Sequence, residues 1–494
     1  MAVSSLPHAA PATGTLTYAQ LGQPSSLDLS VTTDGLATEI SRNIYESLVT
    51  TDHAMEIAPM LAESWAFSAD GTSITFKLRP GIKFHNGAPM TAADVVASMA
   101  RYTRLSSWAT QAMPGAKWSS PDASTVVVKM QGRNPMVLLS MINAWIVPTA
   151  IAEKFPDRAI TEHVGTGPYR FIEWKPDQQI VLEAFNDYLP IKSAPDGTAG
   201  DRTPGYKTVI IKFVPDGQSR MVGLRSGLYD IAAMSPDDYA AIKSSSSLTA
   251  LTQTQGGIYA IYNKAAGVFS KLDARIAANA AVNAKTVMEA TYPDPSLYTL
   301  RSGLMLKSMP QWETKADKAV YNVNDPKLAS ERLKASGYDG SPVRILAVKE
   351  FATSYKPAVV LQQQLQKVGF KTELVVVDWP TYQKKRADPS AFEIMVQNFN
   401  VSGDPFNFTF FNKTWPGFTD SPEINAGVAE ARNEATPAAA SAKLELVAKG
   451  WAAYIPGTKI ADYKNVWGAK RQFADMQMWL GPVLWTARPP QKSN

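Results

Sequence analysis

The chain has 494 residues, 45% of them hydrophobic and 19% charged, a composition typical of a globular protein. Because one hydrophobic core serves about 250–300 residues, this length predicts at least two lobes. Its 49 basic and 44 acidic residues leave a net charge of +5, which over this length is too weak to indicate nucleic-acid binding. The absence of cysteine excludes disulfides, thiolate catalysis and cysteine-ligated metals.

The first residues of the sequence, MAVSSLPHAAPATG, have neither the basic nor the apolar region of a signal peptide. We interpret this small, Ala- and Pro-rich stretch as the start of a mature exported protein whose signal peptide has been removed. A cytosolic protein is the alternative. No apolar run approaches the roughly 20 residues that span a bilayer.

The first half of the chain predicts alternating strands and helices. Ile40, Ile44 and Leu48 recur at intervals of four, which is typical of a helix. Thr91, followed three residues later by Asp94, is the signature of a helix N-terminus. In chain order we expect a strand at 15–19, a helix at 38–48, a half-buried strand at 73–78, a helix capped by Thr91, a strand at 126–128, a loop or boundary at 187–204, a strand at 208–214 and a short helix at 221–228.

The second half contains a clear strand–helix–strand unit. Such a unit favours a mainly parallel sheet with helices on its faces. In chain order we expect a helix at 273–290, an irregular segment at 293–320, the unit itself with strands at 343–348 and 372–377 around a helix at 357–368, and a long helix at 438–451.

The usual signatures of enzymes are missing. There is no phosphate-binding loop or nucleophile elbow, and Gly165-Thr166-Gly167 lacks the third glycine of a dinucleotide fingerprint. We therefore expect no cofactor and no catalysis; a hydrolase that uses two distant carboxylates is the alternative. The densest basic run, 384–386, is interpreted as solvated surface. The four histidines are scattered without metal-ligand spacing, so we expect no metal: His8, His53, His85 and His163.

One long segment carries a family pattern. Residues 62–65 (AESW) and 76–95, with Arg79-Pro80-Gly81 and Thr91-Ala92-Ala93-Asp94-Val95, resemble the family 5 extracellular solute-binding proteins, the dipeptide- and oligopeptide-binding components of ABC importers. The resemblance continues in the same order over nearly the whole chain, at 164–171, 186–188, 226–232, 262–264, 275–280, 336–338, 365–370 and 403–405.

The resemblance implies an α/β fold of the two-lobed periplasmic type II class, with an extra inserted domain and a hinge between the lobes. It implies a monomer that captures a small polar ligand in the cleft as the lobes close and delivers it to a permease in the inner membrane. A peptide-holding chaperone or receptor on the same fold is a further alternative. The implied domains are a first lobe at 1–46, 166–262 and 468–494, an inserted small domain at 47–165 and a distal lobe at 263–467.

The ligand-binding loop departs from the family pattern. Peptide-binding relatives hold the ligand's ammonium with an Asp a few residues before Gly-Asp-Pro, where this chain has only neutral candidates, Asn398, Asn400 and Ser402. Asp404 itself could serve instead. Relatives also place an Arg after the strand at 343–348, and Lys349 could take that role with a ligand carboxylate or could simply pair with its neighbour Glu350.

These departures favour a hydroxylated or acidic solute, such as an opine-like compound, a sugar conjugate or a modified amino acid, over a plain dipeptide, although a peptide-like ligand stays open. Aromatic side chains in irregular stretches are expected to line the cleft beside these polar groups. The aromatic candidates are Trp145, Tyr259, Trp312 and Trp415.

Overall fold

The computed structural model describes residues 12–400 and 403–489, which form two compact units. Unit 1 contains the described residues up to Met234, Ala241–Leu251 and those from Trp467 onward, and unit 2 contains Ser235–Ala240 and Thr252–Val466. Two of the unit boundaries lie inside long strands, β12 (Leu248–Tyr262) and β17 (Gly457–Lys470). The finer division of the first lobe, with its inserted domain, stays a prediction.

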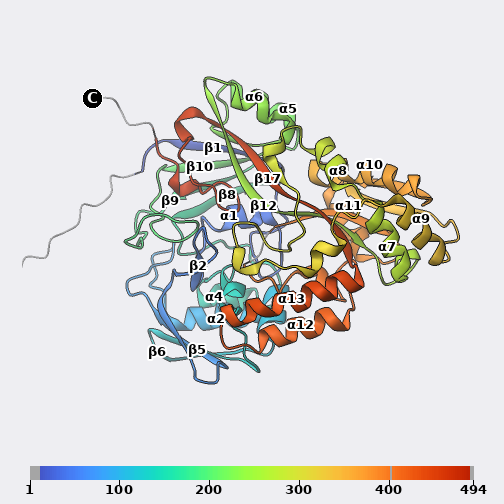
Figure 1. Cartoon of the computed structure of the whole chain (residues 1–494). Coiled ribbons are helices and arrows are strands. Elements are labelled where there is room, and N and C mark those ends of the chain that lie inside the picture. The colour runs from blue at the N-terminus through green and yellow to red at the C-terminus, as the bar shows by residue number, and fades with distance from the viewer. Residues whose placement is uncertain (1–11, 401–402, 490–494) are drawn as a thin grey trace, which may run out of the picture. The chain divides into compact units, whose positions relative to one another are not determined.

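Unit 1 combines short helices with two larger groups of strands (Figure 1). Its elements are β1 (Thr15–Gln20), α1 (Gly35–Ser41), β2 (Val49–Thr51), β3 (Ile57–Pro59), β4 (Ala62–Phe67), β5 (Ser73–Leu78), α2 (Ala92–Leu105), α3 (Ser107–Ala112), β6 (Lys117–Asp122), β7 (Thr125–Lys129), α4 (Thr149–Lys154), β8 (Tyr169–Lys175), β9 (Gln179–Ala184), β10 (Thr208–Phe213), α5 (Gly217–Arg225), β11 (Ile231–Met234) and part of α6 (Tyr239–Lys243).

The strands of unit 1 are partly parallel. The order is β11-β1-β10-β9-β8, with β1 parallel to both of its neighbours and β9 antiparallel to β10 and β8. A separate four-stranded sheet, β4-β5-β7-β6, packs on α2. In β5 the alternate residues Ile74, Phe76 and Leu78 are buried, as the sequence pattern predicts. The predicted N-terminus of α2 is confirmed, because Thr91 and Asp94 form a capping box.

The predicted helix at 38–48 is wrong beyond Ser41, where α1 ends. Ile44 and Leu48 are buried as expected, but their backbone is not helical. The reason is that distant segments use the carbonyl groups that a longer helix would need. Gly167 N–H donates to the Ile44 carbonyl and Tyr169 N–H donates to the Asn43 carbonyl, both over 2.9 Å.

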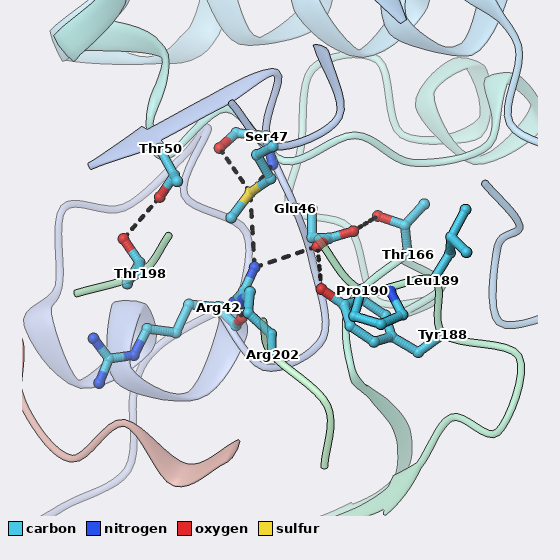
Figure 2. Close-up of polar contacts among 12 residues, drawn as sticks. Arg42, Glu46, Ser47, Thr50, Thr166, Tyr188, Leu189, Pro190, Thr198 and Arg202 are labelled. Carbon is cyan, nitrogen blue, oxygen red and sulfur yellow. Dashed lines mark hydrogen bonds and ion pairs between the residues drawn. The ribbon is translucent and has the colours of Figure 1, made fainter. Parts of the chain in front are cut away.

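The segment after α1 carries a buried polar cluster centred on Glu46 (Figure 2). Thr166 and Tyr188 each donate a hydroxyl hydrogen bond of 2.9 Å to its carboxylate, and Arg202 Nη1 lies 3.5 Å from it. The Arg202 guanidinium also stacks 4.1 Å above the ring centroid of Trp485. Since Tyr188 and Arg202 belong to the irregular stretch 187–204, the cluster holds that stretch against the rest of unit 1.

Unit 2 contains most of the helices in the second half of the chain. Helices α12 and α13 pack against each other (Figure 1). Its elements are α7 (Leu272–Ala281), α8 (Ala284–Thr291), β13 (Tyr298–Thr299), α9 (Pro326–Ala335), β14 (Val343–Val348), α10 (Ala352–Lys367), β15 (Thr372–Val377), α11 (Trp379–Ala387), β16 (Ile394–Asn400), α12 (Pro422–Arg432) and α13 (Pro437–Tyr454).

Two predicted helices of unit 2 have different bounds in the structure. The helix at 273–290 is two helices, because Asn283 interrupts it and caps α8 by accepting a hydrogen bond from Thr286 N–H. The helix predicted at 357–368 starts earlier, at Ala352, with Pro357 inside it. Pro357 is in the second turn of α10, where its missing N–H removes one hydrogen bond of the helix.

The sheet of unit 2 has a switch point at the carboxyl ends of β14 and β16. The strand order is β15-β14-β16-β12, with β14 parallel to β15 and β16, as the predicted strand–helix–strand unit requires. The chain moves from β14 to β15 in one direction and from β15 to β16 in the other, so right-handed crossovers place α10 and α11 on opposite faces. In open α/β sheets, ligands bind at such points.

None of the helices in residues 12–400 and 403–489 is both long enough and apolar enough to cross a membrane.

Candidate functional site

Two asparagines of β16 form a polar row with Tyr463 of β17. Because side chains alternate along a strand, Asn398 and Asn400 lie on the same face, opposite Ile258 and Gly256 of β12. The Tyr463 hydroxyl accepts a hydrogen bond of 2.8 Å from Asn398 Nδ2 and donates one of 3.2 Å to Asn400 Oδ1. Asn400 is exposed at the end of the strand, so the row opens to solvent there.

The first turn of α10 adds a fourth group to this row. The Thr353 hydroxyl donates a hydrogen bond of 3.0 Å to Asn398 Oδ1. All four side chains are uncharged, and burial raises the pKa of Tyr463 above its ordinary value, so its phenol keeps its proton at neutral pH. The row can donate to and accept from hydroxyl, amide or carboxylate groups of a ligand. It holds no proton that it could transfer at neutral pH.

The other face of β16 carries a guanidinium surrounded by aromatic rings. Trp379, Tyr382 and Arg386 recur at i, i+3 and i+7 on α11 and share one side of that helix. The Arg386 guanidinium lies 5.2 Å from the ring centroid of Trp415, 5.8 Å from that of Trp379 and 6.0 Å from that of Tyr382. Its Nη1 donates a hydrogen bond of 2.9 Å to Gln397 Oε1.

The interpretation of residues 384–386 as solvated surface is therefore wrong for Arg386. Lys384 is exposed, but Arg386 is half-buried because its position on α11 turns it toward Trp415 and β16. The helical spacing of Trp379, Tyr382 and Arg386 is the sequence feature that indicates a partly buried Arg386. A helix that places two aromatic residues and an arginine on one side indicates a packed face.

Asp404 is buried and bonded to its own loop. Its Oδ1 accepts a hydrogen bond of 2.9 Å from the Phe406 N–H, the backbone bond that is typical of an Asp before a turn. Burial raises the pKa of Asp404 to about 6, against the opposing effects of the Phe406 hydrogen bond and the Arg432 charge. The Oδ1 atom of this carboxylate is therefore already engaged within its own loop.

Asp404 should make the protein less stable as the pH rises from about 4 to about 6. Its folded pKa of about 6 lies above the ordinary value of 3.8, so the folded state holds the extra proton in this window. The contribution is fully present below pH 4 and is lost as the pH rises through 6. Two pKa units correspond to about 3 kcal/mol at most. The urea-unfolding free energy of Asp404→Asn minus that of the wild type should therefore increase between pH 4 and pH 7. The attraction between Asp404 and Arg432 is already contained in the folded pKa, so a difference that stays constant with pH would contradict the prediction.

The remaining aromatic candidates lie in packed surroundings. Tyr259 is buried against Phe399, Phe410 and Trp451. Trp312 is 5% exposed and packs edge-on against Phe406. Trp415 is half-buried, between Arg386 and Phe399. In unit 1, Trp145 stacks on Tyr45 and donates through Nε1 to Ser41.

Two polar candidates remain. Lys349 is exposed in the turn after β14, and it has no carboxylate within 4 Å among residues 12–400 and 403–489. Ser402 lies outside the described residues. The structure thus brings Asn398 and Asn400 together and adds three groups that the sequence did not indicate: Thr353, Tyr463 and Arg386.

Comparisons with known proteins support the family resemblance that the sequence motifs indicate. The family model described as bacterial extracellular solute-binding proteins, family 5, matches residues 56–419. A probable peptide ABC transporter periplasmic-binding protein of Sinorhizobium fredii is 26% identical over 425 residues, covering 81% of this chain and 80% of the relative. Among solved structures, a periplasmic binding protein of A. tumefaciens R10 in complex with agropinic acid has a TM-score of 0.81 at 23% identity, covering 96% of this chain and 97% of the other. An ABC transporter-associated periplasmic binding protein of Helicobacter pylori in complex with the peptide STSA has a TM-score of 0.83 at 20% identity, covering 96% of this chain and 98% of the other.

Proposed function

Because the chain belongs to the bacterial extracellular solute-binding proteins of family 5, we propose that it binds one small polar solute outside the cytoplasmic membrane and hands it unchanged to the permease of an ABC importer. The two-lobed fold of its structural neighbours and the names of its relatives support this role. We propose that the mature protein is periplasmic and monomeric, and that the permease is its partner.

The observation that carries the proposal is the neutral polar row at the switch point of the unit 2 sheet. Asn398, Asn400, Tyr463 and Thr353 offer both donors and acceptors where α/β sheets bind ligands. A group that catalyses proton transfer needs a pKa near the working pH, and these four side chains have none. The row therefore suits recognition of an oxygen-rich solute better than hydrolysis of one.

The site residues favour a narrower class of solute than the names of the relatives and neighbours cover. Those names and titles include a peptide transporter, a complex with a peptide and a complex with the opine agropinic acid. The neutral row and the engaged Asp404 favour a solute without a free ammonium, because a buried ammonium needs a fixed anion or several acceptors. We propose a hydroxylated or acidic solute of the opine or sugar-conjugate kind.

Replacing both asparagines of the row by alanine should weaken solute binding. Each neutral hydrogen bond contributes about 0.5–1.5 kcal/mol, so Asn398→Ala together with Asn400→Ala should lower the affinity by roughly 10- to 100-fold. The measurement is calorimetry with the small molecule released from the denatured wild-type protein. Asn433→Ala, on an exposed residue after α12, is the matched control. Unchanged affinity in the double variant would remove the row from the binding site.

A further inference from the structure

The covered arginines of this protein are usually neutralised by carboxylates or by backbone carbonyl groups. Arg101 lies 2.6 Å from the Asp28 carboxylate. Arg344 forms a two-point contact with Glu393. Arg275 donates to three backbone carbonyl oxygens and stacks on a tyrosine. These partners offset the cost of taking a guanidinium out of water.

Arg386 is the exception in residues 12–400 and 403–489. It is half-buried, yet its one hydrogen bond goes to the neutral side-chain oxygen of Gln397, and no carboxylate lies within 4 Å. That oxygen is shared, because Tyr382 also donates to it over 3.1 Å. Burial lowers the pKa of Arg386 from its ordinary value, and only the Tyr382 phenol acts against this. Three aromatic rings stabilise the cation, and within residues 12–400 and 403–489 its N–H groups have no protein acceptor other than Gln397.

The rings also fix the direction of the guanidinium. Trp379 and Tyr382 stack with their planes 15° apart and their centroids 5.7 Å apart, and Trp415 lies against the guanidinium from a different segment. A planar guanidinium held in this way presents its remaining donors in a fixed fork, which matches the two oxygens of a carboxylate. Gln397 and Asn398 are consecutive in β16, so their side chains point to opposite faces of the strand, and the fork lies on the face away from the polar row.

We propose that Arg386 binds a carboxylate of the transported solute and makes the protein selective for acidic solutes. The proposal rests on the proposed function and adds the substrate class to it. The solute carboxylate supplies the anion that the described residues do not place within 4 Å of Arg386.

The test compares acids with their neutral amides. The probes are gluconate, glucuronate and N-acetylamino acids, none of which carries an ammonium, each measured beside the corresponding amide by thermal shift and calorimetry. The proteins are the wild type, Arg386→Gln, Arg386→Lys and Lys384→Gln, which removes a neighbouring exposed charge from the same helix. Melting without ligand shows whether each variant is folded.

We expect at least one acid to bind the wild type about 10- to 100-fold more tightly than its amide, since a hydrogen bond to a charged group contributes more than a neutral one. Arg386→Gln should remove that preference, Arg386→Lys should keep only part of it, and Lys384→Gln should leave it unchanged. An Arg386→Gln variant that keeps the preference, or a wild type that shows none, overturns the proposal. If the wild type then binds a neutral solute or a peptide, the proposed function stands; if it binds nothing and releases no small molecule, the proposed function fails too.

Discussion

Replacing Arg202 by methionine should lower the free energy of unfolding by about 3–5 kcal/mol, because removal of one partner from a buried ion pair leaves the other charge uncompensated. Arg202 is 2% exposed and Glu46 is 1% exposed, so little water can reach the carboxylate. Thr166 and Tyr188 would still donate to Glu46, but neither carries a charge. The lost stack of the guanidinium on Trp485 adds to the effect.

Urea unfolding of three variants tests this prediction. Arg170→Met breaks the more exposed ion pair with Glu183 and should cost no more than about 1 kcal/mol. Arg202→Met combined with Glu46→Leu should recover part of the loss, because an apolar pair of similar volume can replace a buried ion pair. A loss below about 1 kcal/mol in Arg202→Met alone would show that the cluster does not hold the 187–204 segment.

Free dipeptides should bind at least 100-fold more weakly than acids of similar size that have no amine, which corresponds to about 2.7 kcal/mol. A zwitterionic peptide brings an ammonium that loses water on binding and needs an anion or several acceptors. The groups of the row are neutral, and Asp404 already accepts the Phe406 N–H beside the Arg432 charge. The acidic solute meets Arg386 and avoids this penalty.

Calorimetry with a mixed dipeptide library checks the prediction, and the same peptides with an acetylated amino terminus are the control. Acetylation removes the ammonium, so it should strengthen binding if the ammonium is the obstacle. Sub-micromolar binding of an unmodified dipeptide would contradict the prediction and would identify Asp404 as the amine anchor, which Asp404→Asn could then confirm.

The sequence predicts elements well where local pattern and packing agree. The alternation in 73–78, the capping residues Thr91 and Asp94, and the parallel strands around α10 all appear as expected. Prediction from the sequence fails where hydrogen-bond partners distant in the chain determine the backbone conformation. The carbonyl groups of Asn43 and Ile44 bond to residues near 168, and nothing in 38–48 itself indicates that the helix must end at Ser41.

The residues of the candidate site also fall into two groups, those that the sequence predicts and those that only the structure reveals. Asn398 and Asn400 could be predicted because they are polar residues beside a family motif. Thr353 and Tyr463 could not, since Thr353 reaches Asn398 only through the packing of α10 on β16, and Tyr463 reaches it from β17, across the intervening strand β12. The basic run at 384–386 predicts solvated surface, but the helical spacing of Trp379, Tyr382 and Arg386 turns the arginine toward β16. Its aromatic neighbour Trp415 is 29 residues away in the chain.

The most direct test of the account is mass spectrometry of the small molecule released when the purified protein is denatured. We expect about one molecule per chain, chemically intact after prolonged incubation with the protein, polar, and carrying a carboxylate but no free ammonium. A mixture of ordinary peptides would contradict the solute class. A molecule that the protein cleaves or converts would contradict the central claim that this protein captures a solute and delivers it unchanged.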